Sequence, residues 1–313
     1  MDASGVRMCP DFIARVARRT GEASAPGGDS CSGSRRRTMQ VMSTGEDRIA
    51  MAAEHFARDG VVVVHGVLDA RWIRYLHAAL DEALAAPTPL AQNLAGARGG
   101  AFRSDMYLSS AFASFREFAL QSPVGELGAR MLGVEHVTLF NDELLVKEPG
   151  TPQETPWHHD MPYWPLGGDS VCSVWIPLDR VTRRAGALEF LRGSHGWGRR
   201  FHPRNFDSGS DRATDAREES LQAFVASDPD QVITTEADPG DCIVFHALTL
   251  HRAFGNTLPD ARRRAIVLRL VGPSVVYEPR PRTIPLIWAP ALAPGNPLST
   301  DPELFPRLWP LAS

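Results

Sequence analysis

The chain has 313 residues, of which 43% are hydrophobic and 22% are charged, and its formal net charge is −4. This length and composition are typical of one large globular domain or two small ones, and the excess of acidic residues gives no basis for a nucleic-acid or anionic-membrane partner. No apolar run approaches the roughly 18 residues of a membrane span, and the four cysteines lack the paired spacing of a zinc site. Reduced thiols and a cytoplasmic location are therefore expected.

The N-terminal segment is rich in Gly, Ser and Arg. We expect residues 1–45 to be a disordered N-terminal extension, because such a composition buries too little apolar surface to fold. Residues 46–313 are then expected to form a single domain.

Three helical segments are predicted before the strands begin. The first covers residues 47–60, ending at Gly60, and is followed by a short β-branched strand, VVVVHGV. The second has Asp69 as its N-cap and apolar residues at helical spacing, and it ends before Pro87. The third covers residues 110–133, with an interruption near Pro123.

After these helices, short strand-like runs dominate: HVTLFNDELLVK, SVCSVWIPLD, ALEFL, QVITTEA, DCIVFHALTL and RAIVLRLVG. Alternation in the second run predicts two faces, one with Cys172, Val174, Ile176 and Leu178 and the other with Val171, Ser173 and Trp175. Helices followed by many short strands indicate an α+β chain whose β part is a sandwich or a barrel.

Two segments differ from this pattern. Residues 199–230 are polar and irregular, which indicates a long insert or a lid. Residues 279–313 are rich in proline, so we expect this tail to wrap the surface of the domain as extended coil.

The stretch WHHD contains a possible metal-binding pair, His158 and Asp160. Residues two apart on a strand face the same side, so this imidazole and this carboxylate are able to bind one ion. The third ligand must come from a distant strand, and GDCIVFHALTLHRAFGN offers His246 and His251. Two histidines and one carboxylate form the facial triad of non-haem Fe(II) oxygenases. A carboxylate at Asp160 leaves no ligand position for a halide, which disfavours a halogenating enzyme.

Four stretches in order give the chain a specific resemblance: HFARDGVVVVHGVLDA, LLVKEPGTPQETPWHHDMPYWP, VWIPLDRVTRRAGALEFLRGSH and GDCIVFHALTLHRAFGNTLPDARRRAIVLR. With these the chain resembles the phytanoyl-CoA dioxygenase family of Fe(II)- and 2-oxoglutarate-dependent oxygenases, from about residue 53 to residue 272. The resemblance implies a double-stranded β-helix (jelly-roll, cupin-like) core with flanking N-terminal helices. It also implies three cofactors or co-substrates, namely Fe(II), 2-oxoglutarate and O2.

The resemblance assigns the metal ligands residue by residue. His158 and Asp160 match the ligand pair of the family, and His251 matches the distal histidine because Asn256 and an Arg-Arg-Ala sequence follow it. By the same comparison His246 is not a ligand. His159 is expected to point away from the metal, since neighbours on a strand face opposite sides.

The family places an arginine for the distal carboxylate of 2-oxoglutarate on the strand after the distal histidine. Alignment on the Ala of Arg-Arg-Ala selects Arg263, whereas ungapped counting from His251 selects Arg262, and both alternatives stay open. Lys147 is a further candidate for a 2-oxoglutarate carboxylate, with a surface lysine as the alternative. Trp175 is expected to line the barrel beside the cofactor.

Several other residues have two interpretations each. Arg269 is either a second inward arginine or a surface charge, and Ser194 and His195 either shape a turn or lie near the site. A group of aromatic residues forms either a substrate wall or part of the core: Trp157, Tyr163, Trp164 and Trp197.

The predicted function is hydroxylation of an unactivated C–H bond in a small or medium-sized, partly apolar, secondary-metabolite-like molecule, with release of succinate and CO2. Desaturation or cyclisation uses the same groups. The alternative classes are a non-oxidative cupin-type metal-binding isomerase or binding module, and an inactive scaffold, against which the intact triad argues. A small-molecule substrate is expected, without nucleic acid or membrane, for a monomer or homodimer.

Overall fold

The computed structural model describes residues 45–95, 99–206, 210, 221, 229–281, 283–284, 286 and 292–311. The predicted N-terminal extension lies outside the described residues except for Gly45, and so does most of the predicted insert at 199–230. In the described part of the chain, no helix is long and apolar enough to cross a membrane.

The helices precede most of the strands, as the sequence predicts. They are α2 (Gly45–Asp59), α3 (Ala70–Ala85), α4 (Leu108–Ala111), α5 (Ala113–Gln121) and α6 (Val124–Leu132). Asp69 caps α3, since its carboxylate accepts hydrogen bonds from the backbone N–H groups of Arg71 and Trp72 at 2.9 and 3.0 Å. Pro123 separates α5 from α6, which confirms the predicted interruption.

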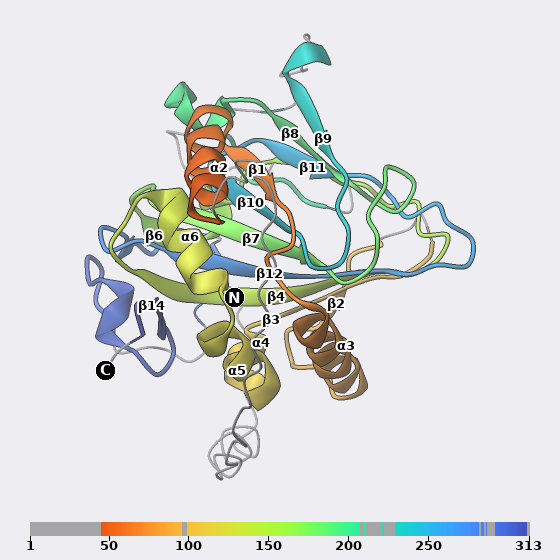
Figure 1. Ribbon diagram of the computed structural model, residues 1–313, viewed down its shortest axis with the longest axis horizontal. Helices are drawn as coiled ribbons and strands as arrows, with labels where there is room; N and C mark the ends of the chain where they lie inside the picture. Colours follow the sequence, from red (N-terminus) through yellow and green to blue (C-terminus); the bar gives the residue numbers. More distant parts are fainter. Residues whose placement is uncertain are drawn as a thin grey trace, which may run out of the picture.

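The larger sheet has eight strands, and every pairing within it is antiparallel (Figure 1). Its order is β1 (Val61–Val64), β10 (Cys242–His246), β7 (Val171–Pro177), β12 (Arg263–Val271), β4 (Val137–Lys147), β3 (Phe102–Met106) and β2 (Gln92–Asn93), with β14 (Arg307–Trp309) also paired to β4. Strands far apart in sequence are thus neighbours, and β12 lies between β7 and β4.

A smaller antiparallel sheet has four strands in the order β5 (Thr155–His158), β11 (His251–Ala253), β8 (Leu188–Leu191) and β9 (Val232–Thr235). A two-stranded ribbon joins β13 (Val276–Tyr277) to β6 (Leu166–Gly167). Side chains of both larger sheets share one apolar cluster, in which Trp175, Phe245 and Val267 meet Leu188 and Phe190. The fold is therefore α+β with a jelly-roll core, as expected.

The helices cover the outer face of the larger sheet (Figure 1). Cys172, Val174 and Ile176 of β7 pack there against the helical layer, whereas Trp175 belongs to the cluster between the sheets. The predicted alternation of this strand is confirmed. All seven of its residues are buried, because both faces of the sheet are covered.

Two features differ from the sequence prediction. The expectation of a C-terminal tail in extended coil was wrong for its last part, because β14 extends the larger sheet and the side chains of Leu298 and Phe305 are buried. Strand β3 was not predicted. Its sequence, FRSDM, has too few apolar residues to indicate a strand, and the strand forms because it pairs with β4.

Candidate metal centre

Two histidines lie opposite each other in the smaller sheet. His158 is the last residue of β5, His251 is the first residue of β11, and the two are cross-strand partners with ring centroids 4.2 Å apart. Both side chains are buried. This pairing explains how residues 93 positions apart in the sequence reach one point.

Asp160 joins the histidines by a different route from the one predicted. Its backbone has φ −78° and ψ −36°, so it lies beyond the end of β5 and begins the short 3-10 turn Met161–Tyr163. The expectation that strand alternation places His158 and Asp160 on one face was therefore wrong for Asp160. A hydrogen bond of 2.9 Å from the Asp160 backbone N–H to the Ala247 carbonyl fixes this turn.

The hydrogen bonds of the two histidines leave one ring nitrogen of each available. His158 Nδ1 lies 2.8 Å from the Pro156 carbonyl and His251 Nδ1 lies 2.9 Å from the Thr249 carbonyl, so each Nδ1 carries the proton and donates it. The two Nε2 atoms then face Asp160 Oδ1 as unprotonated acceptors, at 3.6 and 3.8 Å.

These distances suit a metal ion between the three groups. They are too long for hydrogen bonds, whereas ligands that share one ion at about 2.0–2.2 Å lie about 3–4 Å apart. Among the described residues this is the group of histidines and carboxylates able to hold a metal, with its ligand atoms all within 4.8 Å of one another. Two imidazoles and one carboxylate fit Fe(II) with open coordination positions.

Charge also favours a cation at this point. Burial raises the pKa of Asp160, but the neighbouring His158, His251 and Arg269 outweigh burial and hold the pKa of this carboxyl well below its usual range. Ser173 donates a further hydrogen bond to Asp160 Oδ2 at 3.2 Å. Burial lowers the pKa of His251 to about 3, so its imidazole is neutral and able to bind a metal.

The two neighbouring histidines of the same sequence stretches, His159 and His246, do not face the metal centre. His159 Nε2 accepts a 2.9 Å hydrogen bond from the backbone N–H of Phe201. His246 Nδ1 accepts a 3.1 Å hydrogen bond from the backbone N–H of Leu248, and its ring lies 5.3 Å from that of His195. Neither is part of the three-residue group.

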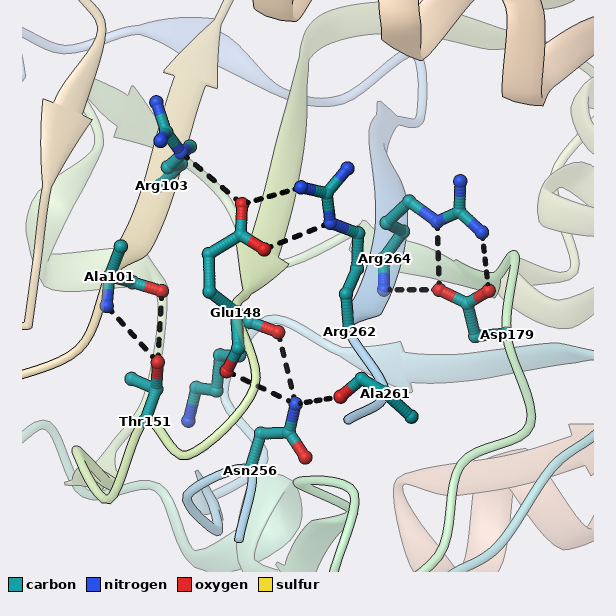
Figure 2. Close-up of polar contacts among 10 residues, drawn as sticks. Ala101, Arg103, Glu148, Thr151, Asp179, Asn256, Ala261, Arg262 and Arg264 are labelled. Carbon is teal, nitrogen blue, oxygen red and sulfur yellow. Dashed lines mark hydrogen bonds and ion pairs between the residues drawn. The ribbon is translucent and has the colours of Figure 1, made fainter. Parts of the chain in front are cut away.

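The three consecutive arginines lie at the start of β12, with Arg262 just before the strand and Arg263 and Arg264 within it. Because neighbouring residues of a strand face opposite sides, their side chains point in different directions. Arg262 forms a two-point ion pair with Glu148, with both N···O distances 2.9 Å, and Arg264 forms another with Asp179 (Figure 2). Arg263 points to the opposite side and lines the cavity that contains the triad. The side chain of Arg262 does not line this cavity, so Arg263 is the better candidate for 2-oxoglutarate.

Arg263 has the environment of an anion-binding residue. It is 2% exposed, its guanidinium lies 5.5 Å from the Trp175 ring, and one Nη donates to the Leu145 carbonyl at 3.2 Å. Its buried Nε has no hydrogen-bond partner, and no carboxylate of the described residues forms an ion pair with it. Burial lowers the pKa of Arg263 to about 10. An incoming carboxylate would satisfy both the charge and the free Nε.

Lys147 is buried, and it does not line the cavity. Its ammonium donates to the carbonyls of Gln153 at 2.9 Å and Phe254 at 2.6 Å. Gln153 precedes β5 and Phe254 follows β11, so Lys147 joins the two strands that carry His158 and His251. The alternative of a surface lysine was wrong, and a direct contact between Lys147 and a ligand is not apparent.

Asn256, five residues after His251, has a structural position nearby. Its side-chain N–H groups donate to the carbonyls of Lys147, Glu148 and Ala261 at 3.1, 3.2 and 2.7 Å (Figure 2). The fully buried Asn256 thereby fixes the end of β4 against the start of β12, where Arg263 lies.

The site has an inner and an outer chamber. The inner chamber contains the triad, Arg263 and Trp175, and the outer chamber of about 510 Å³ begins at Asp160. Both chambers share Phe206, whose ring lies 4.9 Å from that of His158. Phe206 was not predicted as a site residue, because it lies in a segment without a regular sequence pattern.

The four aromatic candidates divide into two pairs. Tyr163 and Trp164 line the outer chamber. Trp157 packs against an apolar cluster that includes Leu191 and Phe201, with the Arg252 guanidinium over its ring, and Trp197 is 39% exposed. Neither residue lines the two chambers.

The turn after β8 lies close to the metal centre without lining the chambers. Ser194 Oγ donates to the Leu191 carbonyl at 2.7 Å and accepts from the Leu250 backbone N–H at 2.9 Å, so it supports the residue before His251. His195 contacts the Ala57 carbonyl at 3.2 Å. Both residues shape the turn.

Arg269 points inward and lines both chambers. Its partner there is Glu143, which was not predicted as a site residue. Asn141, Asp142 and Glu143 are three consecutive polar residues within the otherwise mainly apolar run of β4, and this break in the pattern is the signal that could have indicated them.

Comparisons with known proteins agree with this geometry. A sequence model of the family described as Phytanoyl-CoA dioxygenase (PhyH) matches residues 56–265, which are 210 of the 313 residues. The chain is 27% identical over 110 residues to a probable phytanoyl-CoA dioxygenase of Caenorhabditis elegans, which covers 34% of this chain and 33% of that protein. It is 28% identical over 135 residues to a probable alpha-ketoglutarate-dependent hypophosphite dioxygenase of Stutzerimonas stutzeri, over 43% of this chain and 45% of that protein.

These matches span less than half the length of either curated relative. Among solved structures, the epimerase SnoN in complex with Fe3+, alpha ketoglutarate and nogalamycin RO is similar with a TM-score of 0.67 and 23% identity. The match covers 83% of this chain and 98% of SnoN. At this identity the likeness shows a shared fold.

Proposed function

The chain belongs to the phytanoyl-CoA dioxygenase family, and on this basis we propose that it is an Fe(II)- and 2-oxoglutarate-dependent dioxygenase that hydroxylates a small or medium-sized, partly apolar metabolite. The observation that carries the proposal is the buried triad of His158, Asp160 and His251 in one cavity with Arg263. A metal site alone is common to many jelly rolls. A buried arginine with no carboxylate partner in the described part of the chain points to an anionic co-substrate.

In this proposal the residues of the chain divide into binding and orienting roles. His158, Asp160 and His251 would hold Fe(II), with the carbonyls of Pro156 and Thr249 fixing the two imidazoles. Arg263 would bind the distal carboxylate of 2-oxoglutarate through its planar guanidinium. Trp175 and the surrounding apolar side chains of the inner chamber exclude water from the bound co-substrate.

When bound, Fe(II) supplies the oxidation in which 2-oxoglutarate and O2 yield succinate and CO2, with one oxygen atom going to succinate and the other to the substrate C–H bond. The outer chamber lies next to Asp160 and is the place for the substrate. Its walls combine apolar and aromatic side chains with polar ones, which supports a partly apolar, secondary-metabolite-like molecule. Desaturation and cyclisation are further outcomes of the same site.

The competing proposal is a non-oxidative metal-binding jelly roll of the cupin type. Such a protein has use for the triad and none for the buried Arg263, which is why the oxygenase is favoured. A small-molecule substrate, a cytoplasmic location and a monomeric or homodimeric state complete the proposal, and the reduced buried thiols of Cys172 and Cys242 fit that location.

The proposal is tested by O2-dependent turnover of 2-oxoglutarate. We expect the iron-loaded protein to convert 2-oxoglutarate to succinate slowly without substrate and faster with a suitable one. His251→Ala should abolish the conversion, since it removes a ligand. Failure of the folded, iron-loaded protein to form succinate across a broad substrate panel would favour the non-oxidative alternative.

A further inference from the structure

The inward face of β12 carries an arginine near each end. Arg263 and Arg269 are six residues apart, about 20 Å along a strand, with Ala265 and Val267 between them on the same face. Arg263 has no carboxylate partner among the described residues, whereas Arg269 has one. The two ends of the cavity therefore differ in the charge that they offer to a ligand.

Arg269 belongs to a compact polar cluster on adjacent strands. One Nη donates to Glu143 Oε2 at 2.6 Å and the other donates to Asn141 Oδ1 at 3.0 Å. Ser104 on β3 donates a hydrogen bond to Glu143 Oε1. The guanidinium lies 5.3 Å from the Trp164 ring. The Arg269 and Glu143 side chains are 12% and 10% exposed, so the pair is largely removed from bulk water.

This cluster forms the wall of the outer chamber beside Asp160. Among the described residues, four charged side chains line that chamber, and they balance in sign: Asp160 and Glu143 against Arg204 and Arg269. The remaining walls combine apolar and aromatic groups, among them Met106 and Ile284, with neutral amides. The outer chamber therefore offers a ligand a donor and an acceptor close together with no net charge, whereas Arg263 offers a cation without a carboxylate partner among the described residues.

A buried ion pair contributes little net stability compared with an apolar pair of the same volume, so stability alone does not account for this one. The pair retains capacity for a ligand. The buried Nε of Arg269 has no hydrogen-bond partner, and each Glu143 oxygen has a second lone pair.

We propose, building on the oxygenase function above, that Arg269 and Glu143 form a substrate-recognition pair that selects neutral molecules carrying a hydroxyl or carbonyl group on a mainly apolar skeleton. A hydroxyl group is able to accept from Arg269 and donate to Glu143 at once. An anion meets the carboxylate of Glu143, and a cation meets the guanidinium of Arg269, so each loses hydration energy that no free counter-charge replaces. Acyl-CoA thioesters and small oxyanions are thereby disfavoured as substrates.

Three probes of the same ring system test this selectivity: 2-naphthol, 2-naphthoate and naphthalene. Binding is measured by equilibrium dialysis under nitrogen, with protein loaded with Fe(II) and saturating 2-oxoglutarate so that Arg263 is occupied. We expect 2-naphthol to bind at least tenfold more tightly than either of the other two. Glu143→Gln keeps the shape of the side chain and, through its one carbonyl oxygen, the hydrogen bond from Arg269, while Ser104 Oγ must accept from the new amide N–H. It leaves Arg269 without a counter-charge. It should raise the affinity for 2-naphthoate at least tenfold and invert the preference.

Glu148→Gln is the matched control, because it removes the carboxylate of a similar ion pair with Arg262 outside the chambers, and it should leave all three affinities unchanged. The inference is overturned by 2-naphthoate binding to the unmodified protein as tightly as 2-naphthol, by an unchanged preference in Glu143→Gln, or by no probe binding at all. A visible Fe(II)–2-oxoglutarate band in the same samples reports separately on the oxygenase proposal. Its absence would contradict that proposal, and this inference with it.

Discussion

Lys147 and Arg263 lie directly opposite each other in the antiparallel pair of β4 and β12, and neither forms an ion pair with a carboxylate of the described residues. Burial lowers the pKa of both groups, and for Lys147 the charge of Arg263 lowers it further. Two adjacent buried cations are unfavourable unless an anion binds beside them. A carboxylate bound to Arg263 relieves this arrangement, and the first two predictions follow from it.

Arg263→Gln and Arg262→Gln form a matched pair of neighbouring substitutions. The first removes the only unpaired guanidinium that lines the inner chamber among the described residues, so the affinity for 2-oxoglutarate should fall about 100-fold or more. The second removes a partly exposed ion pair with Glu148, worth at most about 1 kcal/mol of stability, and should leave the affinity unchanged. The measurement is a 2-oxoglutarate titration of each iron-loaded protein. An equal loss in both variants would contradict the assignment of Arg263.

Lys147→Met removes the ammonium that joins the strands of the two histidines. The carbonyls of Gln153 and Phe254 then have no donor, which costs about 1–3 kcal/mol of folding stability. Removal of the buried charge offsets part of this cost. We expect a small change in thermal midpoint, with affinities for Fe(II) and 2-oxoglutarate both at least tenfold weaker. Lys147→Gln retains hydrogen-bond donors without the charge and should recover Fe(II) affinity alone. Normal binding of both ligands by the Met variant would refute a positioning role for Lys147.

Substitution of the two histidines of the GDCIVFHALTLHRAFGN stretch should have opposite effects on iron binding. His251→Ala should reduce bound iron after dialysis to a few per cent of the level in the unmodified protein, since two ligands hold the ion poorly. His246→Asn keeps an acceptor for the Leu248 N–H and should retain iron at the normal level. Iron is measured per folded chain, with circular dichroism as the control for folding. Loss of iron in His246→Asn alone would reverse the ligand assignment.

The burial of His246 also leads us to expect that the folding stability of the protein depends on pH. Burial, followed by the charge of His195, lowers the pKa of His246 to about 4, against the attraction of Asp169. Because this folded-state pKa is below the unfolded value of about 6.5, the unfolded chain binds the proton first as the pH falls. The stabilising contribution is therefore complete above pH 6.5 and is lost between about pH 6.5 and pH 4, by up to about 3 kcal/mol.

The check compares urea midpoints of the unmodified protein and His246→Asn at pH 7.5, 5.5 and 4.5. Buried groups such as His159 contribute equally to both proteins, so the difference between the two curves isolates His246. The variant should show the shallower fall in stability. Parallel curves would mean that His246 is not held neutral by its surroundings.

The strands and helices that face the core were predictable because each has its own periodic pattern. The alternation in β7 and the cap at Asp69 are local signals, and both are present in the structure as expected. Alternation in β12 also placed Arg263 with Ala265 and Val267. What the sequence did not provide was the partner of each outward arginine, since Glu148 and Asp179 are 114 and 85 residues away from Arg262 and Arg264.

The position of Asp160 shows why the rest was harder to predict. The residue type and the spacing from His158 were sufficient to single it out, but the chain turns at Asp160 because the backbone bonds to Ala247 on a distant loop. The pairing of Arg269 with Glu143 likewise depends on the register between β12 and β4, which is set by the whole sheet. Polar residues on an inward face can be noticed in a sequence, whereas their partners require the fold.

The central claim, that one buried site holds both Fe(II) and 2-oxoglutarate, is tested most directly by adding the two to metal-free protein under nitrogen. We predict the weak visible charge-transfer band expected of Fe(II) chelated by 2-oxoglutarate, with its loss in His251→Ala and its displacement to much higher 2-oxoglutarate concentrations in Arg263→Gln. A folded protein that binds iron and shows no band at saturating 2-oxoglutarate would contradict the claim and favour a non-oxidative metal jelly roll.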